Sequence, residues 1–227
     1  MQVGGTSGKT KYNVGLGYWD QDGIADGFTF EKTNALINVD SQVNDYVKIG
    51  AYVNGTISKR TEPYNGERDY LMGILSQSPT YKPWLLDGSG RYTGNNGGTM
   101  PESQGYADVS SKNAYAISKS PNALTYDDRF ALNANAYLEA KLFEGLTWYT
   151  KAGVDITQTK YKNRRPVLRM YSYRTGEFQG NLDNIGSEQL IHRMGNTQHY
   201  TIFSHLNYQK TIFEDHNFGL MVGASQE

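Results

Sequence analysis

The sequence predicts an all-β protein of antiparallel, up-and-down strands. The first observation is strict alternation of apolar and polar residues, clearest from Val47 to Ile57, which gives a strand one apolar and one polar face. The second is the length of that stripe. At about 3.3 Å per residue it is about 33 Å long, which exceeds the length of an ordinary globular strand. The third is that short and long connections alternate. Together they predict part of a transmembrane β-barrel, whose apolar band is about 25 Å tall.

The N-terminal third is expected to hold one strand followed by a hairpin. The strand is predicted over 11–20, where apolar residues recur at every second position, with a short turn before it at Gly4 to Lys9. A loop rich in turn residues follows from Asp20 to Gly27. Two alternating runs between Ala35 and Ile57, separated by a few residues around Val43 to Asp45, predict an antiparallel hairpin.

The middle and C-terminal parts repeat this organisation around two long connections. Residues 61–125 are expected to be mostly irregular, with a short helix before Pro79, and 160–198 to form a second long loop. Between them, alternation over 129–140 and 146–157 predicts a hairpin with a tight turn at 143–145. A last hairpin is predicted from the runs at 202–208 and 218–224.

All the short turns fall at one end of the predicted strands and the long connections at the other. This asymmetry is typical of outer-membrane barrels, which have short periplasmic turns and long extracellular loops. The alternative is a soluble β-sandwich with two large insertions, serving as a surface module that binds glycans or peptides. Sandwich strands also alternate, but their loops need not sort by length.

Composition excludes several classes of protein. A net charge of -1 gives no strong field for nucleic acid, and no run of 18 apolar residues is present to form a membrane helix. There are no cysteines, so disulfides and thiolate metal sites are excluded. Eighteen tyrosines against eight phenylalanines suit the aromatic girdles of a barrel, where one side of the ring is wet. The N-terminus shows no signal-peptide pattern, so a fragment of an exported protein is expected.

Several motifs resemble the SusC/RagA family of TonB-dependent outer-membrane transporters. They are Tyr12 to Gly23, Asn34 to Asp40 followed by Val47 to Ala51, and an ending from Leu206 to Phe213 that continues from His216 to Glu227. The resemblance implies a barrel of about 22 strands with a separate N-terminal plug. It also implies energised import of oligosaccharides or peptides across the outer membrane, with a SusD-type lipoprotein as lid.

Within that family the chain is expected to be an internal part of the barrel. It offers about seven strands and the end of another at Gln2 and Val3, whereas a closed single-chain barrel needs at least eight. The whole of 1–227 is then barrel wall, with no plug. Outer-membrane lipid would surround it, and contact with the TonB complex would be made through an N-terminal part that this sequence does not contain.

No motif predicts catalysis, a cofactor or a metal. Val3 to Thr10 approaches a phosphate-binding loop, but valine stands where glycine is needed and a strand follows instead of a helix. Asp20 to Gly23 lacks the later ligands of a calcium loop. His199 and His205 share a strand face but lie roughly 20 Å apart, too far to share one ion. We therefore expect no enzyme activity.

Side chains alternate between the two faces of a strand, so odd and even positions face opposite ways; this strand parity predicts the candidate functional residues. The apolar stripe from Val47 to Ile57 should face lipid, because a charged side chain at mid-bilayer costs about 2–4 kcal/mol. The alternate residues should then face a polar channel, where tyrosine can stack on sugar rings and charges can bind hydroxyls or peptides. The candidate substrate-facing residues are Lys48, Tyr52, Tyr137, Glu139, Tyr149, Lys151 and Asp155.

A second candidate is the basic segment from Lys160 to Arg174, which contains no acidic residue. Its central members, Arg164, Arg165 and Arg169, are expected on an extracellular loop. There they would meet lipopolysaccharide phosphates, an acidic substrate or the lid protein, rather than nucleic acid. The alternative is that the segment is simply a solvated loop.

Overall fold

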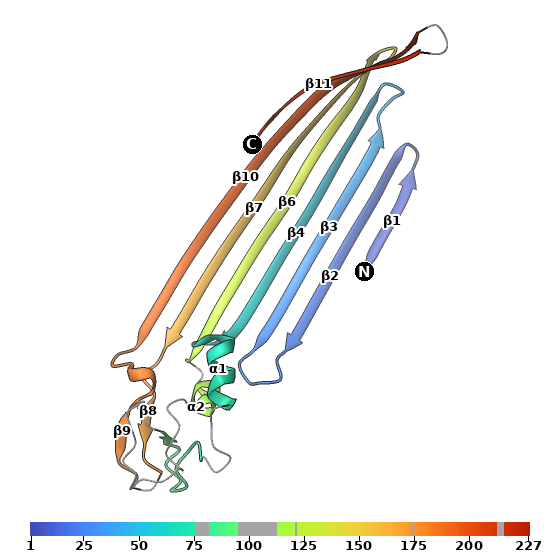
Figure 1. Ribbon diagram of the computed structural model, residues 1–227. Helices are drawn as coiled ribbons and strands as arrows, with labels where there is room; N and C mark the ends of the chain where they lie inside the picture. The colour runs from blue at the N-terminus through green and yellow to red at the C-terminus, as the bar shows by residue number, and fades with distance from the viewer. Residues whose placement is uncertain (76–81, 95–112, 121, 174, 213–215) are drawn as a thin grey trace.

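The chain forms one long antiparallel sheet with a small cap at one end (Figure 1). The structure is a computed structural model that describes residues 1–227 except 76–81, 95–112, 121, 174 and 213–215. Consecutive long strands are neighbours throughout the sheet, which confirms the predicted up-and-down all-β fold. The order is β1 (Gln2–Ser7), β2 (Thr10–Asp22), β3 (Thr29–Gln42), β4 (Val47–Pro63), β6 (Leu124–Phe143), β7 (Leu146–Arg165), β10 (Gln189–Ile212) and β11 (His216–Gln226).

Strand pairing aligns the apolar stripes into a single face. Val53 of β4 lies opposite Ile37 of β3 and Ala134 of β6, and Ala134 lies opposite Val154 of β7. Because side chains alternate along every strand, residues in register with Val53 form one apolar face and those in register with Tyr52 form one polar face. The sheet therefore separates two environments.

The apolar face has a clear boundary at the cap end. A row of charged residues crosses five strands there in direct register: Asp20, Glu31, Lys59, Asp128 and Lys160. Beyond this row, toward the short turns, the described strands carry no charged side chain on this face until Lys210 of β10. Aromatic residues lie along both edges of the band, as on membrane barrels. They are Tyr18 and Phe130 near the charged row, and Trp148 and Tyr208 near the short turns.

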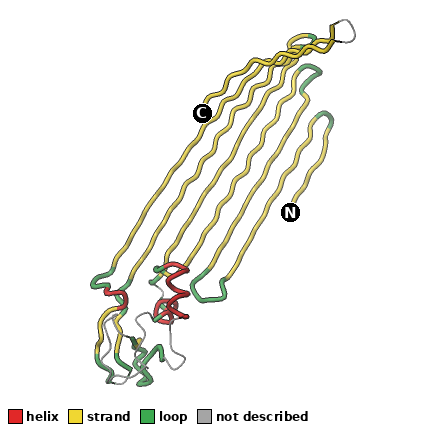
Figure 2. Tube along the Cα trace, in the orientation of Figure 1, coloured by secondary structure: helices red, strands yellow, loops and turns green. Residues whose placement is uncertain are grey.

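The long connections fold together into the cap (Figure 2). It contains α1 (Gly66–Leu75), α2 (Ala114–Lys119), the short helical turn η3 (Leu182–Asn184) and a three-stranded sheet of β5 (Tyr92–Thr93), β8 (Arg169–Tyr171) and β9 (Phe178–Asn181). No described helix is long and apolar enough to cross a membrane. The cap holds the main cluster of buried apolar side chains: Tyr64, Tyr70, Ala114, Ala116, Ile117, Ala123, Leu168, Met170, Leu182 and Ile185.

Buried polar side chains tie the cap together and join it to the sheet. The Asn163 amide, at the end of β7, donates to the Tyr64 carbonyl oxygen at 2.7 Å and to Thr125 Oγ1 at 2.6 Å. Asn113 caps α2 by accepting from the Ala116 backbone N–H, and its own amide donates to the carbonyls of Pro83 and Thr93. Each of these asparagines bridges segments far apart in the sequence.

The predicted helix before Pro79 is confirmed as α1, but three boundaries were wrong. Gly4 to Ser7 lies in β1 and not in a turn, because it pairs with β2. The predicted loop 160–198 is much shorter: β7 continues to Arg165 and β10 begins at Gln189. In these extensions the alternation breaks down, because lysine and arginine occupy the β7 positions that are apolar nearer the short turns, and Leu190 and Ile191 of β10 are consecutive apolar residues. Backbone pairing nevertheless continues.

Candidate functional site

The polar face of the sheet is the candidate functional surface. Register places all seven predicted substrate-facing residues on it, although their contact with a substrate is still a prediction. Lys48 lies opposite Glu139, which lies opposite Tyr149, and Tyr137 lies opposite Lys151 in the adjoining row. The other two, Tyr52 and Asp155, occupy rows closer to the cap.

Tyr137 is the centre of a polar cluster near the short-turn end. Its hydroxyl donates a hydrogen bond to Asp40 Oδ1, and the Lys48 ammonium lies 5.5 Å from its ring centroid. Gly50 makes this arrangement possible, because a Cβ there would come within 2.2 Å of the Tyr137 ring and 2.7 Å of Asp40 Oδ1. Alternation along β3 predicts the face of Asp40 but not its contact with Tyr137, because β4 lies between their two strands.

Aromatic rings continue the cluster across three strands. Tyr137 of β6 stacks on Tyr149 of β7, with centroids 5.7 Å apart and an interplanar angle of 21°. Tyr149 in turn contacts His205 at 5.2 Å and Phe203 at 6.3 Å, both from β10. Phe203 and His205 were not among the predicted site residues, although the alternation of β10 places both on this face. The rings form a ladder suited to stacking on a planar or ring-shaped group.

A hollow lies beside this ladder on the cap side. Lys151 and Asp155 line it with opposite charges, and the Asn133 amide donates to the Asp155 carboxylate. Gly153 leaves space between the two charged residues. The polar groups that line the hollow can bind a ligand that carries both a carboxylate and a cation or hydroxyl. The lining residues are Asn133, Ala134, Asn135, Lys151, Gly153, Asp155, Thr201 and Phe203.

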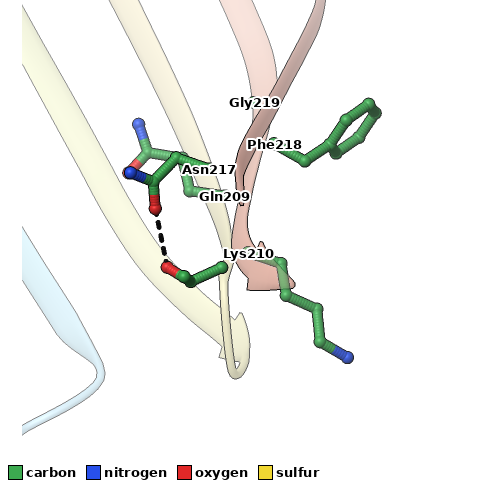
Figure 3. A pocket seen from close by; sticks show the side chains of 6 residues that line it. Gln209, Lys210, Asn217, Phe218 and Gly219 are labelled. Atoms are coloured by element: carbon green, nitrogen blue, oxygen red, sulfur yellow. Dashed lines mark hydrogen bonds between the residues drawn. The ribbon is translucent and has the colours of Figure 1, made fainter. Parts of the chain in front are cut away.

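A second hollow lies at the far end of β10 and β11, in the last hairpin (Figure 3). Phe218 and Lys210 point to one side of the hairpin there, and Gln209 and Asn217 to the other. Thr211 Oγ1 donates to Asn217 Oδ1 at 2.8 Å across the strand pair. Because its lining residues point to both faces of the hairpin, this hollow is a surface irregularity rather than a binding site.

The three predicted loop arginines are not together on a loop. Arg164 lies at the end of β7, donates to Asn122 Oδ1 at 2.9 Å and lies 3.4 Å from Glu188 Oε2. Arg165 is on the opposite face and donates to Asn163 Oδ1 at 3.0 Å, whereas Arg169 belongs to β8 in the cap. Strand pairing therefore divides the basic segment between two faces and two sheets.

An ionic cluster joins the two long connections within the cap. Asp87 accepts hydrogen bonds from the Ser89 hydroxyl and backbone N–H and from Arg91 Nη2, and these bonds lower the pKa of Asp87 to about 2. The Arg91 guanidinium also stacks 4.8 Å from the Tyr171 ring centroid. The described residues contain no group of three or more His, Asp and Glu side chains arranged to hold a metal ion.

Comparisons with known proteins show the fold of the chain. No family model and no curated protein matches the sequence. Among solved structures, the RagAB peptide importer in its closed-closed state matches with a TM-score of 0.67 and 22% identity over 98% of this chain. The open-open state gives 0.67 and 22% over 99%, and a further structure of the RagAB peptide transporter gives 0.66 and 20% over 99%.

The match covers nearly all of this chain but a small part of each importer chain. In all three comparisons the present chain spans 23% of the length of its counterpart. Both the long sheet and the cap fall within the matched region, since 98–99% of the chain is covered. The chain therefore shares its fold with a segment of the RagAB peptide importer.

Proposed function

We propose that this chain is a wall segment of an outer-membrane β-barrel that imports nutrients. The observation that carries the proposal is the division of charge between the two faces. Among the described strand residues, the apolar face carries no charged residue between the cap-side charged row and Lys210, whereas the polar face carries Asp40, Lys48, Lys151 and Asp155 at the same heights. Burying even one charge in lipid costs about 2–4 kcal/mol, so the apolar face meets lipid and the polar face lines a wet channel.

Peptides are the favoured substrates. Three solved structures that share the fold are of a peptide importer or transporter. The polar face also offers an acid and a base across one hollow, together with a ladder of rings, which suits the termini and side chains of peptides. Oligosaccharides, which can stack on the same tyrosines, are the alternative substrate class. A SusD-type lipoprotein lid and drive by the TonB complex complete the proposed importer.

The proposal is tested by arginine substitutions at neighbouring positions of β4 in the full-length protein. Ala51→Arg and Val53→Arg place a charge on the apolar face and should sharply reduce the amount of barrel assembled in the outer membrane. Tyr52→Arg and Asn54→Arg place the same charge on the polar face and should leave assembly intact while changing uptake. Heat-modifiable mobility of the barrel on gels measures assembly, and uptake of labelled peptides measures transport.

Two outcomes would contradict the proposal. If the two pairs exchange phenotypes, the apolar face lines the channel and the substrate-facing residues are wrong. If all four variants assemble equally well, the strand is not in lipid, and a soluble sandwich that binds glycans or peptides becomes the better explanation. Partition settles that alternative separately, because a sandwich stays soluble without detergent.

A further inference from the structure

Three basic side chains form a column on the apolar face, immediately beyond the lipid-facing band. Lys160, Lys162 and Arg164 alternate along β7, so all three point to the same face as Val154 and Ile156. We propose that this basic column binds the phosphate groups of lipids in the adjacent leaflet. The inference rests on the proposed function, because it requires the apolar face to be surrounded by lipid.

Two cations of the column have no bonding partner among the residues that the structure describes. Lys160 and Lys162 are exposed, and neither makes a hydrogen bond or an ion pair with any described residue. Arg164 is partly engaged, through Asn122 and Glu188. Its guanidinium still has donors beyond those two bonds.

The neighbouring acids do not neutralise the column. Asp128 lies opposite Lys160, but it also lies opposite Lys59 on its other side, so it is shared between two cations. Glu188 contacts Arg164 at 3.4 Å, and no other described ion pair involves the column. The β2 and β3 side of the same face is acidic, through Asp20 and Glu31, so positive charge is concentrated over β7.

The surroundings favour a lipid over a free anion or an acidic protein. On β10 the residues opposite the column are Leu190, His192 and Met194, of which Leu190 and Met194 are 62% and 70% exposed. A free phosphate gains nothing from exposed apolar neighbours. A lipid presents a phosphate and an apolar body together, in the order in which the sheet presents cations and then the apolar band.

The test compares two triple variants of the full-length protein in detergent micelles. K160Q/K162Q/R164Q removes the positive charge of the column, and K32Q/R129Q/R193Q removes three positive charges from the polar face, in the two rows that flank the row of Lys160. The probes are fluorescent lipid A with both phosphates, the same lipid without phosphates, and inorganic phosphate as competitor. Assembly of each variant in the outer membrane is measured alongside.

We expect the column variant to bind phosphorylated lipid A at least about tenfold more weakly, since each basic residue near a membrane surface contributes about 1 kcal/mol. The control variant should bind phosphorylated lipid A like the native protein. The lipid without phosphates should bind equally to the native protein and to both variants. Native affinity in the column variant would overturn the inference. Full displacement of the lipid by inorganic phosphate would also overturn it.

Failure of the inference is distinct from failure of the proposed function. A column variant that assembles normally and binds phosphorylated lipid normally disproves the lipid site while leaving the wall segment intact. Failure of the native protein to enter lipid at all, together with equal assembly of the four β4 arginine variants, disproves the wall segment and the lipid site with it.

Discussion

The closest packing on the polar face depends on a missing side chain. At Gly50 a methyl group would clash with the Tyr137 ring, whereas at Gly55 of the same strand it would meet nothing within 4 Å. Gly50→Ala should therefore displace Tyr137 from Asp40 and Tyr149 and destabilise the sheet by about 1–3 kcal/mol, the usual cost of overpacking. The measurement is the urea concentration at which the assembled barrel unfolds in detergent.

Gly55→Ala serves as the matched control for Gly50→Ala. Both glycines lie within β4, so the change in the freedom of the unfolded chain is the same. We expect Gly55→Ala to leave the unfolding midpoint unchanged or slightly raised. Equal destabilisation by the two substitutions would show that the Tyr137 contact has no part in the effect.

Tyr64 makes the cap sensitive to alkaline pH. Burial raises the pKa of Tyr64 well above its ordinary value of 10.0, and the hydrogen bond from its hydroxyl to Asp183 Oδ2 at 2.6 Å adds to the shift. The folded cap holds this proton more tightly than the unfolded chain, so the cap should lose stability as pH rises above about 10. Limited proteolysis across this pH range should show the cap opening before the sheet.

The variant Tyr64→Phe isolates this titration from general alkaline unfolding. It removes the hydroxyl and should lower the free energy of unfolding of the cap by only about 1 kcal/mol at neutral pH, because the exposed Asp183 can accept a hydrogen bond from water instead. Above pH 10 its cap should lose less stability than the native cap. An unchanged slope of stability against pH would assign the alkaline opening to other groups.

At the scale of elements, α2 depends on one buried asparagine. Asn113 is fully buried and its side chain makes three hydrogen bonds, to Ala116 N–H at 2.9 Å and to the carbonyls of Pro83 and Thr93 at 2.7 and 2.8 Å. Asn113→Ala leaves these buried groups unpaired, and each unpaired group should destabilise the cap by about 1–3 kcal/mol. We expect the cap to become protease-sensitive while the barrel still assembles.

Ser118→Ala is the control for the asparagine variant. Ser118 also bonds to a backbone carbonyl, that of Tyr115 at 3.0 Å, but its hydroxyl is exposed and water replaces the bond. This variant should resist protease like the native cap. Similar cleavage of both variants would mean that helix propensity, and not the buried bonds, holds α2 in place.

The sequence predicts the strands best where they have two unlike faces. Between Val47 and Ile57 alternation alone identifies β4 correctly, because one face is apolar and the other polar. At 160–165 and 189–198 it fails, since lysines occupy the positions of β7 that are apolar elsewhere and Leu190 and Ile191 of β10 are consecutive, so only backbone pairing shows the strand. The cap was predicted only as α1, because its core is assembled from short segments spread over 64–185.

The candidate site was predictable to the level of a face and no further. Parity is a property of one strand, so it correctly grouped Tyr137 with Tyr149. Contacts such as Tyr137 with Asp40 depend on which rows meet across several strands, and that requires the register of every hairpin between them. The contact between the Phe203 and His205 rings, which are tilted relative to each other, could not be predicted for the same reason.

At the scale of the whole molecule, the sheet is open among the strands that the structure describes. Its order runs from β1 to β11 without a pairing between those two strands, so both outer edges carry unpaired backbone groups. Such groups are costly in lipid. Purified residues 1–227 should therefore give no discrete single-channel conductance in a planar bilayer. Stable unitary currents from the monomeric chain would show that the sheet closes on itself.

The cap leaves the sheet and returns to it at neighbouring points. Pro63, at the end of β4, pairs with Leu124, at the start of β6, although the whole first long connection lies between them. The two ends of that connection are therefore as close as the ends of an ordinary hairpin turn. A segment attached in this way can be exchanged for another of different length or sequence without moving a strand. In the proposed outer-membrane wall, this arrangement would let the surface at the cap end differ between related proteins while the strands keep their register.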